Sequence, residues 1–486
     1  MRTILSFAIL VFVVASGGST RAQSLTPKQG RDALLKAAGF FTDSVSASGG
    51  YLWQYSADLS QREGEGRASA TQVWVQPSGT PSVGEAFLEA YLVTNEQVLL
   101  GAARNAAYAL ADGQLLSGGW DYRIEFDPKR RPSSAYRLDS ERSDVAPSPK
   151  AKNVTTLDDD TTQSALRFLM KMDSVLNFKD RKIHGAVEYA LAALMQAQYP
   201  NGAWPQRYSE FPDPKQFPVK RASYPEFWPR EHPKLDYRSY YTFNDNTLAD
   251  LIDTFFLAGQ IYQNDRYSKA ARDAGDFILL AQMPEPQPAW AQQYNADMHP
   301  AWARRFEPTA VTGGESQGVI RVLMTLYRRT GDDKYLEPIP GALNYFERSK
   351  LPDGRLARFY ELKTNRPLYF TTKYELTYDD SDLPTHYGFK VGGNIAALRA
   401  EYERTKAAGQ DTKPLWTTTR RKPGTSKKLT AEAANLVRQM DARGAWVEDG
   451  QLRDKNNQRQ DAKVITTRTF IRNLRTLSRF VAANRK

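Results

Sequence analysis

The chain has 486 residues, among them 66 Lys and Arg and 55 Asp and Glu, and carries a formal net charge of +11 at pH 7. It contains no cysteine, which excludes disulfides, thiolate nucleophiles and cysteine-bound zinc. A chain of this length can bury one or two sizeable cores without covalent crosslinks.

The N-terminus has the pattern of a signal peptide. Residues 1–2 supply a basic start, residues 4–15 form an apolar run too short to span a bilayer comfortably, and Thr20-Arg21-Ala22 ends the segment with small residues. We therefore expect a signal peptide over residues 1–22 and a secreted or periplasmic protein whose mature chain begins near Gln23. A membrane anchor is the alternative.

The positive charge favours an anionic partner, either a nucleic acid or an acidic polysaccharide. The chain has no block of Lys and Arg and no nucleic-acid-binding motif. Secretion also favours the polysaccharide, and exposed rings among the 25 Tyr, 22 Phe and 9 Trp would suit the apolar faces of sugars. We expect an acidic polysaccharide as partner, no nucleic acid, no membrane span in the mature protein, and a monomer.

Helical periodicity dominates the rest of the chain, with apolar residues recurring every three or four positions. Alternating strand patterns are few and short, at residues 356–360 and 368–371. The predicted helices cover residues 32–41, 84–93, 161–176, 184–198, 247–261, 267–282, 316–329 and 467–482.

Turns that combine a small residue or glycine with an aromatic residue recur at residues 49–51, 118–120, 202–204 and 444–446, and residues 353–355 are similar. Such turns are common in loops, but several follow a helix directly, where glycine caps the helix in the left-handed conformation. Repeated helical hairpins that curve round would gather their loops at one mouth. We predict an all-α fold, an incomplete α/α toroid with long irregular loops and a few short strands. The predicted parts are residues 23–149 (N-terminal helical part), 150–405 (catalytic toroid) and 406–486 (basic linker and C-terminal helical hairpin).

Two long irregular segments interrupt the helices, at residues 125–155 and 207–241. Loops of this length in a compact domain are usually functional or disordered. The second is rich in aromatic as well as basic residues, which argues against a solvated tail. We expect it to fold over the mouth.

The densest acidic run, TLDDDTTQ at residues 156–163, leads into a predicted helix. Asp160 can cap that helix, and the helix dipole eases one further charge. A hard cation with oxygen ligands accounts for Asp158, Asp159 and Asp160 together more completely.

A second oxygen-rich segment, YTFNDNT at residues 241–247, precedes another predicted helix. Asn244 and Asp245 offer oxygen ligands, while Asn246 or Thr247 can cap the helix. The two segments together indicate two sides of one cation site.

Basic and aromatic residues alternate in AWARRFEP at residues 301–308 and in LARFYE at residues 356–361. Paired Arg304 and Arg305 can grip a sugar carboxylate through bidentate hydrogen bonds, although a surface ion pair is the simpler explanation. Arg358 and Arg366 also lie among basic and aromatic residues, and His386 lies in a polar loop that can face a cleft. No histidine has metal-ligand spacing, and no nucleophile elbow, P-loop or dinucleotide fingerprint occurs.

Together these segments resemble the family ten pectate lyases. The matching motifs are TLDDDTTQ, YPNGAWPQ at residues 199–206, TFND at residues 242–245, ARRFE at residues 303–307 and ARFYE at residues 357–361. The resemblance implies an α/α toroid and Ca²⁺-dependent eliminative cleavage of polygalacturonate.

Carried residue by residue, the resemblance places the calcium and substrate carboxylates on Asp158, with Asp159 or Asp160 beside it, and on Asp245 next to Asn244. It places the arginine base on Arg304, with Arg305 as the rival. The substrate contacts expected with it are Trp204, Arg358, Arg366 and His386.

This chemistry needs such groups, because removing the C5 proton of a uronate builds negative charge on its carboxylate, which a cation and arginines stabilise. Two other interpretations remain open. One is a toroid glycoside hydrolase for charged oligosaccharides, with Asp158 and Asp245 as acid and base. The other is a non-catalytic protein that binds polyuronate.

Overall fold

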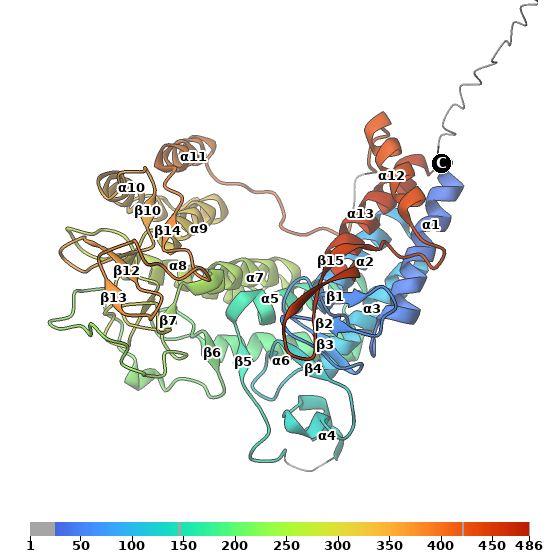
Figure 1. Ribbon diagram of the computed structural model, residues 1–486, viewed down its shortest axis with the longest axis horizontal. Coiled ribbons are helices and arrows are strands. Elements are labelled where there is room, and N and C mark those ends of the chain that lie inside the picture. Colours follow the sequence, from blue (N-terminus) through green and yellow to red (C-terminus); the bar gives the residue numbers. More distant parts are fainter. Residues whose placement is uncertain (1–24, 144–146, 420–421, 486) are drawn as a thin grey trace, which may run out of the picture.

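The computed structural model describes residues 25–143, 147–419 and 422–485; the predicted signal peptide at residues 1–22 lies outside this part. Helices make up most of the regular secondary structure of the described chain (Figure 1). The helices are α1 (Pro27–Phe40), α2 (Thr80–Thr94), α3 (Gln97–Asp112), α4 (Arg137–Ser143), α5 (Thr161–Val175), α6 (Arg181–Ala197), α7 (Thr247–Tyr262), α8 (Asp265–Ala281), α9 (Glu315–Thr330), α10 (Ile339–Arg348), α11 (Ile395–Ala408), α12 (Lys427–Gln439) and α13 (Thr467–Asn484).

The strands are short and form small antiparallel sheets between the helices. The larger sheets have the strand orders β15-β16-β1-β2 and β13-β12-β11-β9. The strands are β1 (Gln54–Ser56), β2 (Arg62–Glu63), β3 (Gln72–Trp74), β4 (Arg123–Glu125), β5 (Thr155–Thr156), β6 (Arg207–Tyr208), β7 (Tyr241–Thr242), β8 (Gln293–Tyr294), β9 (Val311–Thr312), β10 (Leu356–Ala357), β11 (Phe359–Tyr360), β12 (Pro367–Phe370), β13 (Leu376–Thr377), β14 (Lys390–Val391), β15 (Glu448–Arg453) and β16 (Arg459–Thr466).

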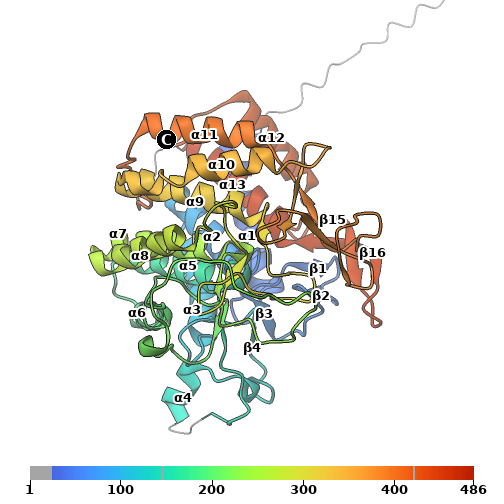
Figure 2. The ribbon, with the colours of Figure 1, turned by 90° about the vertical axis from the view of Figure 1, so that its left-hand side faces the viewer.

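The helices pack as an open arc of hairpins. Helices α13, α2, α5 and α7 pack side by side on the inner layer, and α3, α6 and α8 each pack on an inner partner from outside. Helices α1 and α12 pack against α13, so the C-terminal pair sits beside the N-terminal helix. Figures 1 and 2 show α9, α10 and α11 at the other end of the arc, which does not close. The predicted incomplete α/α toroid is confirmed.

One repeated turn builds the hairpins. The first glycine of each recurring turn has a left-handed backbone, and at Gly202, with φ 93°, a Cβ atom would come within 2.0 Å of the carbonyl oxygen of Asp273 in the next outer helix. The tryptophan two residues later then hydrogen-bonds a carbonyl of the preceding helix. These bonds join Trp120 to Leu110, Trp204 to Leu194 and Trp446 to Leu436 at 2.8, 2.7 and 2.9 Å. The turn therefore sets the spacing of outer helices and places the start of every inner helix at one mouth.

Periodicity does not predict α3, α10, α11 or α12. Helix α3 has alanines on nearly every side and α11 is largely charged, so neither shows a clear apolar stripe. Helices α10 and α12 do bury an apolar stripe, but α10 is short and begins with proline and glycine, and α12 carries many charges. The C-terminal helical hairpin is also interrupted, because the β15–β16 hairpin separates α12 from α13. Its strands are charged and exposed over most of their length, which hides the alternation that marks a strand.

A single hydrophobic core runs through the arc from α1 to α13. A smaller apolar cluster lies under the sheet formed by β9, β11, β12 and β13. Within the described residues, no helix is long and apolar enough to cross a membrane.

Candidate active site

The candidate site lies where α5 and α7 begin. Each helix follows a short 3₁₀ turn, η3 (Asp158–Asp160) before α5 and η5 (Asn244–Asn246) before α7. In both turns the second and third residues have a left-handed backbone, with φ of 51° and 57° in η3 and of 48° and 60° in η5. The two turns pack against each other, so equivalent positions of neighbouring hairpins face one another.

Asp158, Asp159 and Asp245 form an acidic cluster at these turns. One carboxylate oxygen of each lies within 4.8 Å of the others. Asp158 is 7% exposed, and its Oδ1 has no hydrogen-bond partner in the part of the chain that the structure describes. Burial, followed by the charges of neighbouring carboxylates, raises the pKa of Asp159 to about 6 and that of Asp245 to about 7. The cluster thus carries a repulsion that an oxygen-ligated cation would relieve.

The second oxygen of Asp158 is held by neighbouring strands. The Tyr122 hydroxyl donates to Asp158 Oδ2 at 2.9 Å, and Arg207 donates to the same oxygen at 3.4 Å. The Arg207 guanidinium also lies over the Tyr122 ring, 5.3 Å from its centroid. Since Arg207 belongs to β6, which pairs with β5 just before Asp158, backbone pairing brings this arginine to the cluster.

The other two acids also receive hydrogen bonds from amides. Gln76 Nε2 donates to Asp159 Oδ2 at 3.0 Å, and Asn244 Nδ2 donates to Asp245 Oδ2 at 2.5 Å. Asn244 therefore lies beside the cluster with its amide nitrogen toward Asp245, and its role as a cation ligand stays a prediction.

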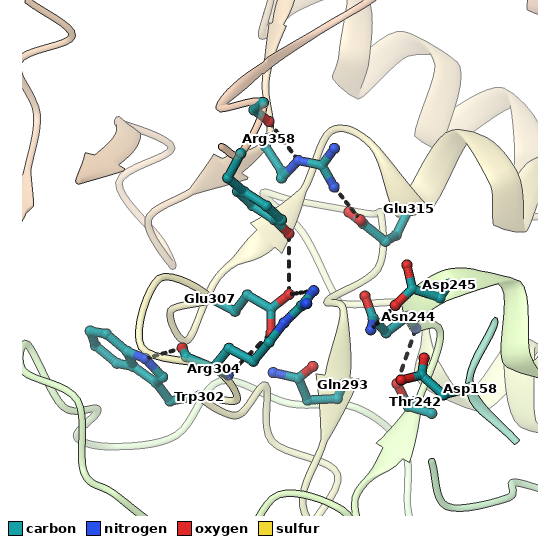
Figure 3. Close-up of polar contacts among 12 residues, drawn as sticks. Asp158, Thr242, Asn244, Asp245, Gln293, Trp302, Arg304, Glu307, Glu315 and Arg358 are labelled. Atoms are coloured by element: carbon teal, nitrogen blue, oxygen red, sulfur yellow. Dashed lines mark hydrogen bonds and ion pairs between the residues drawn. The ribbon is translucent and has the colours of Figure 1, made fainter. Parts of the chain in front are cut away.

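Arg304 lies across the site from Asp158 and Asp245 (Figure 3). Its guanidinium pairs with Glu307, which is 1% exposed, at 2.5 Å, and its backbone N–H donates to the other oxygen of that carboxylate at 3.1 Å. Burial lowers the pKa of Arg304, but Glu307, Tyr387 and Asp245 together raise it well above the ordinary value. The guanidinium is therefore charged in this arrangement.

Arg358 closes one wall of a cavity beside the cluster. Its Nη1 donates to Glu315 Oε1 at 2.7 Å, its Nε donates to the carbonyl oxygen of Gly388 at 2.7 Å, and its guanidinium lies 4.7 Å from the centroid of the Tyr387 ring. Asp245, Glu315 and Arg358 together line this cavity of about 310 Å³. A ligand in the cavity can therefore meet both the acidic cluster and an arginine.

The loop at residues 207–241, which we expect to fold over the mouth, contacts residues beside Arg304. His232 Nε2 lies 3.1 Å from the carbonyl oxygen of Ala303, beside Arg304, and Arg230 forms an ion pair with Glu361. Burial and the charge of Glu307 raise the pKa of Tyr237. The hydroxyl of Tyr237 is therefore close enough to the charged residues of the site to feel their electrostatic effect.

The prediction that Trp204 contacts substrate is wrong. Its side chain is fully buried and stacks on Phe255 with ring centroids 5.2 Å apart. Its Nε1 donates to the carbonyl oxygen of Leu194. The ring belongs to the repeated turn and stabilises the core.

Asp160 does not belong to the acidic cluster, which corrects its predicted role as a cation ligand. Both of its carboxylate oxygens accept from Arg167, at 2.7 and 2.6 Å. It makes no side-chain cap to α5 either. The left-handed turn directs Asp160 toward the inner layer of helices, where the arginine neutralises it.

The remaining predicted residues lie in loops and do not line this cavity, and their roles stay predictions. Arg305 lies 4.7 Å from the centroid of the Tyr374 ring and donates to a backbone carbonyl at 2.8 Å. His386 lies against the same tyrosine, with ring centroids 5.6 Å apart. Arg366 lies 3.4 Å from the centroid of the Tyr378 ring. No contact among the described residues joins these three side chains to the acidic cluster.

Sequence reasoning did not assign roles to Gln76, Tyr122, Arg207, Glu307 or Glu315. Arg207 directly follows the YPNGAWPQ motif and Glu307 lies in ARRFE, so both had a local signal. Gln76 and Tyr122 come from distant segments with no motif of their own, and only the packing of hairpins brings them to the cluster.

Comparisons with known proteins give one family match and several similar structures. The model of the family described as pectic acid lyase matches residues 114–357. A search of curated proteins finds no match. Among solved structures, a family 10 polysaccharide lyase from Cellvibrio cellulosa is similar, with 20% identity, a TM-score of 0.45, and coverage of 67% of this chain and 97% of that chain. A D-mannose isomerase shows 14% identity, a TM-score of 0.42, and coverage of 94% and 97%. The segment that the family model matches contains the acidic cluster and Arg304.

Proposed function

We propose that this chain, which belongs to the pectic acid lyase family and is a polysaccharide lyase, cleaves polygalacturonate by β-elimination with Ca²⁺ bound at the acidic cluster. One observation carries the proposal. The carboxylates of Asp158, Asp159 and Asp245 converge within 4.8 Å of one another, and Arg304 faces them across the site (Figure 3).

The donor set fits Ca²⁺. Ca²⁺ takes oxygen ligands, mainly carboxylates, in flexible geometry. Asp158 offers a buried Oδ1 that has no donor within the described chain, and Asp159 and Asp245 are crowded enough to have raised pKa values. We assign these three as the residues that would hold the ion. Bound there, Ca²⁺ would supply positive charge for the uronate carboxylate and disfavour protonation of a nearby guanidine.

Arg304 is the proposed base. Elimination removes the proton on C5 of a uronate and releases the 4-linked sugar, whose oxygen is the leaving group. The pair with Glu307 opposes this role, because a raised pKa leaves little neutral guanidine. We infer that Arg304 reacts through a small neutral fraction and that its charged form otherwise orients the substrate carboxylate. Arg305 is the rival, but its side chain lies on Tyr374.

Arg358 is the proposed contact for a second uronate carboxylate. It lines the cavity together with Asp245, and its hydrogen bonds to Glu315 and to the carbonyl of Gly388 fix the guanidinium. A fixed guanidinium loses little freedom when it binds a carboxylate. His386 is a proposed contact at the rim, where it lies against Tyr374.

The cluster geometry favours a shared cation over inverting hydrolysis. An inverting glycosidase separates its two carboxyl groups by about 6.5–9.5 Å to admit a water molecule. The oxygens of Asp158 and Asp245 lie within 4.8 Å of each other, which leaves no such room. The third acid, Asp159, has no place in a two-carboxylate mechanism.

An elimination assay tests the proposed function. Elimination creates a conjugated C4–C5 double bond that absorbs in the ultraviolet, whereas hydrolysis and binding do not. We expect the protein to release absorbing products from polygalacturonate when Ca²⁺ is present and to stop when a chelator is added. New reducing ends without absorbance would identify a hydrolase, and binding without either would identify a polyuronate-binding protein.

The same proposal includes a secreted or periplasmic monomer. The pattern of residues 1–22 supports export, and an acidic plant polysaccharide is met outside the cell. Export followed by N-terminal sequencing should find a mature chain that begins near Gln23. A chain that keeps its N-terminus in the membrane would instead identify an anchor.

A further inference from the structure

A groove rich in arginine lies beyond the acidic cluster. Two adjoining cavities, of about 500 and 520 Å³, are both lined by Ser78, Arg468 and Arg472 and therefore form one groove. The groove runs between α2, the start of α13 and the β15–β16 hairpin, which Figure 2 shows beside β1 and β2. We call it the arginine groove and describe it by Trp53, Ser78, Arg453, Arg459, Arg468 and Arg472.

Four arginines of the groove are not neutralised. Within the residues that the structure describes, Arg453, Arg459, Arg468 and Arg472 form no ion pair. Arg472 donates only to two neutral side chains of its own helix, each at 3.3 Å. Arg459, Arg468 and Arg472 are exposed, so their guanidinium groups are available to a ligand.

The acids of the groove, in contrast, are mostly satisfied by the protein. Glu63 is 3% exposed and Glu448 is half-buried, and both carboxylates accept hydrogen bonds. Glu85 is neutralised by an ion pair, and Glu65 is left exposed near Asp159, whose pKa its charge helps to raise. The partners are Gln54 for Glu63, Thr466 and Thr469 for Glu448, and Lys171 for Glu85. Hydrogen bonds to neutral groups leave the charges of Glu63, Glu65 and Glu448 in place, so four unpaired arginines face three unpaired carboxylates and the groove keeps a net charge of +1 (4 − 3).

Two hydrogen bonds through Gln76 link the wall of the groove to the acidic cluster. Trp53 lines the groove and donates from Nε1 to the carbonyl oxygen of Gln76 at 3.0 Å. Gln76 in turn donates from its side chain to Asp159 at 3.0 Å. The half-buried Trp53 ring offers an apolar face of the kind on which sugar rings stack. A linear polymer that leaves the cluster can thus pass Trp53 before it reaches Arg468 and Arg472.

We propose that the arginine groove binds uronate units of the same polymer beyond those at the acidic cluster. Arg468 and Arg472 are one helical turn apart on the exposed face of α13, about 6 Å from each other, so two guanidinium groups can engage carboxylates in series along the polymer. The identity of the polymer rests on the proposed function, since arginines alone also attract other polyanions. All the residues that define the groove lie outside residues 114–357, the segment that the family model matches. This chain therefore extends the site with its own N- and C-terminal parts.

Affinity electrophoresis in native gels that contain polygalacturonate tests the groove without requiring turnover. The variant Arg468→Ala/Arg472→Ala loses two charges, and the control Arg404→Ala/Arg479→Ala loses two charges from exposed sites that line neither cavity. We expect the groove variant to bind polygalacturonate about tenfold more weakly, the range for two exposed ionic contacts, and the control to bind as the parent does. Arg459→Ala on the β-hairpin gives an independent second variant with a smaller loss.

Each outcome of this test decides the inference. Equal retardation of the groove variant and the control overturns it, as does a loss of binding to double-stranded DNA with binding to polygalacturonate unchanged. Failure of the proposed function is separate. If the parent protein forms no unsaturated product but its retardation still depends on Arg468 and Arg472, the groove is confirmed as a polyuronate-binding surface. The proposal that the protein cleaves polygalacturonate is then wrong.

Discussion

Replacing Asp245 by Asn should stabilise the metal-free protein at alkaline pH. The substitution keeps the size of the side chain and removes one of three converging negative charges. Burial and the charges of Asp158 and Asp159 raise the pKa of Asp245 from 3.8 to about 7. A shift of this size corresponds to about 4 kcal/mol in a fully buried site. Since the Asp245 side chain is exposed at the mouth, solvent screening reduces the expected gain to about 1 kcal/mol.

The sign of this effect depends on pH. The folded protein binds the proton of Asp245 more tightly than the unfolded chain does, so the free energy of unfolding falls as the pH rises from about 4 to about 7. The asparagine variant has no carboxyl group at this position, so its free energy of unfolding does not fall for this reason over the same pH range. The two proteins should therefore differ little in Tm at pH 5 and differ by a few degrees at pH 8.

Ca²⁺ should reverse the order. A ligand that binds only the folded protein stabilises it by about 2.7 kcal/mol at a concentration 100 times its Kd, and the variant has lost one carboxylate ligand. Thermal unfolding would be measured at pH 5 and pH 8, with Ca²⁺ and with a chelator. Asp297→Asn is the control, because this exposed carboxylate pairs with Lys220 and has a lowered pKa. Its Tm should not respond to Ca²⁺ differently from that of the parent.

Two results would refute this reasoning. An asparagine variant that is no more stable than the parent at pH 8 in chelator would show that Asp245 bears no unrelieved repulsion. An equal gain in Tm from Ca²⁺ in both proteins would show that Asp245 is not a ligand.

Four further substitutions separate the roles of residues in and near the site. Arg304→Ala should abolish elimination while leaving binding of polygalacturonate largely intact, whereas Arg305→Ala should keep most of the turnover; the opposite ranking would move the base to Arg305. Asp160→Asn should destabilise the protein by about 1–2 kcal/mol, because the half-buried Arg167 loses its paired carboxylate but keeps hydrogen bonds to Asp250 and Thr254, and the Ca²⁺ requirement measured in the elimination assay should not change. Trp204→Ala should lower the free energy of unfolding by about 3–5 kcal/mol, as for other buried aromatic residues. A variant that is as stable as the parent but binds substrate more weakly would show that Trp204 contacts substrate after all.

The arc and its mouth follow from patterns that the chain repeats. Gly118 and Gly202 begin turns that end in Trp120 and Trp204, and the structure gives both glycines a left-handed backbone. The same repeat explains why the acidic run and the Asn244-Asp245 segment, each at the start of an inner helix, meet in one cluster. The spacing of these motifs is sufficient to predict the cluster, because the motifs that carry the prediction are local turns at the starts of helices.

Contacts between distant segments were not predictable in this way. Gln76 reaches Asp159 only because neighbouring hairpins pack together. Asp160 looks like its two acidic neighbours in sequence, yet the turn directs it to Arg167. Trp204 has the composition of a sugar platform, and only its packing shows that the ring is buried. Direction and burial of a side chain depend on tertiary contacts that periodicity does not contain.

The most direct test of the account measures the ultraviolet absorbance of polygalacturonate incubated with the purified protein. We expect absorbance that rises when Ca²⁺ is present, stops rising when a chelator is added, and does not appear with the Arg304→Ala variant. No absorbing product from polygalacturonate, alginate or glucuronan, with or without Ca²⁺, would contradict it.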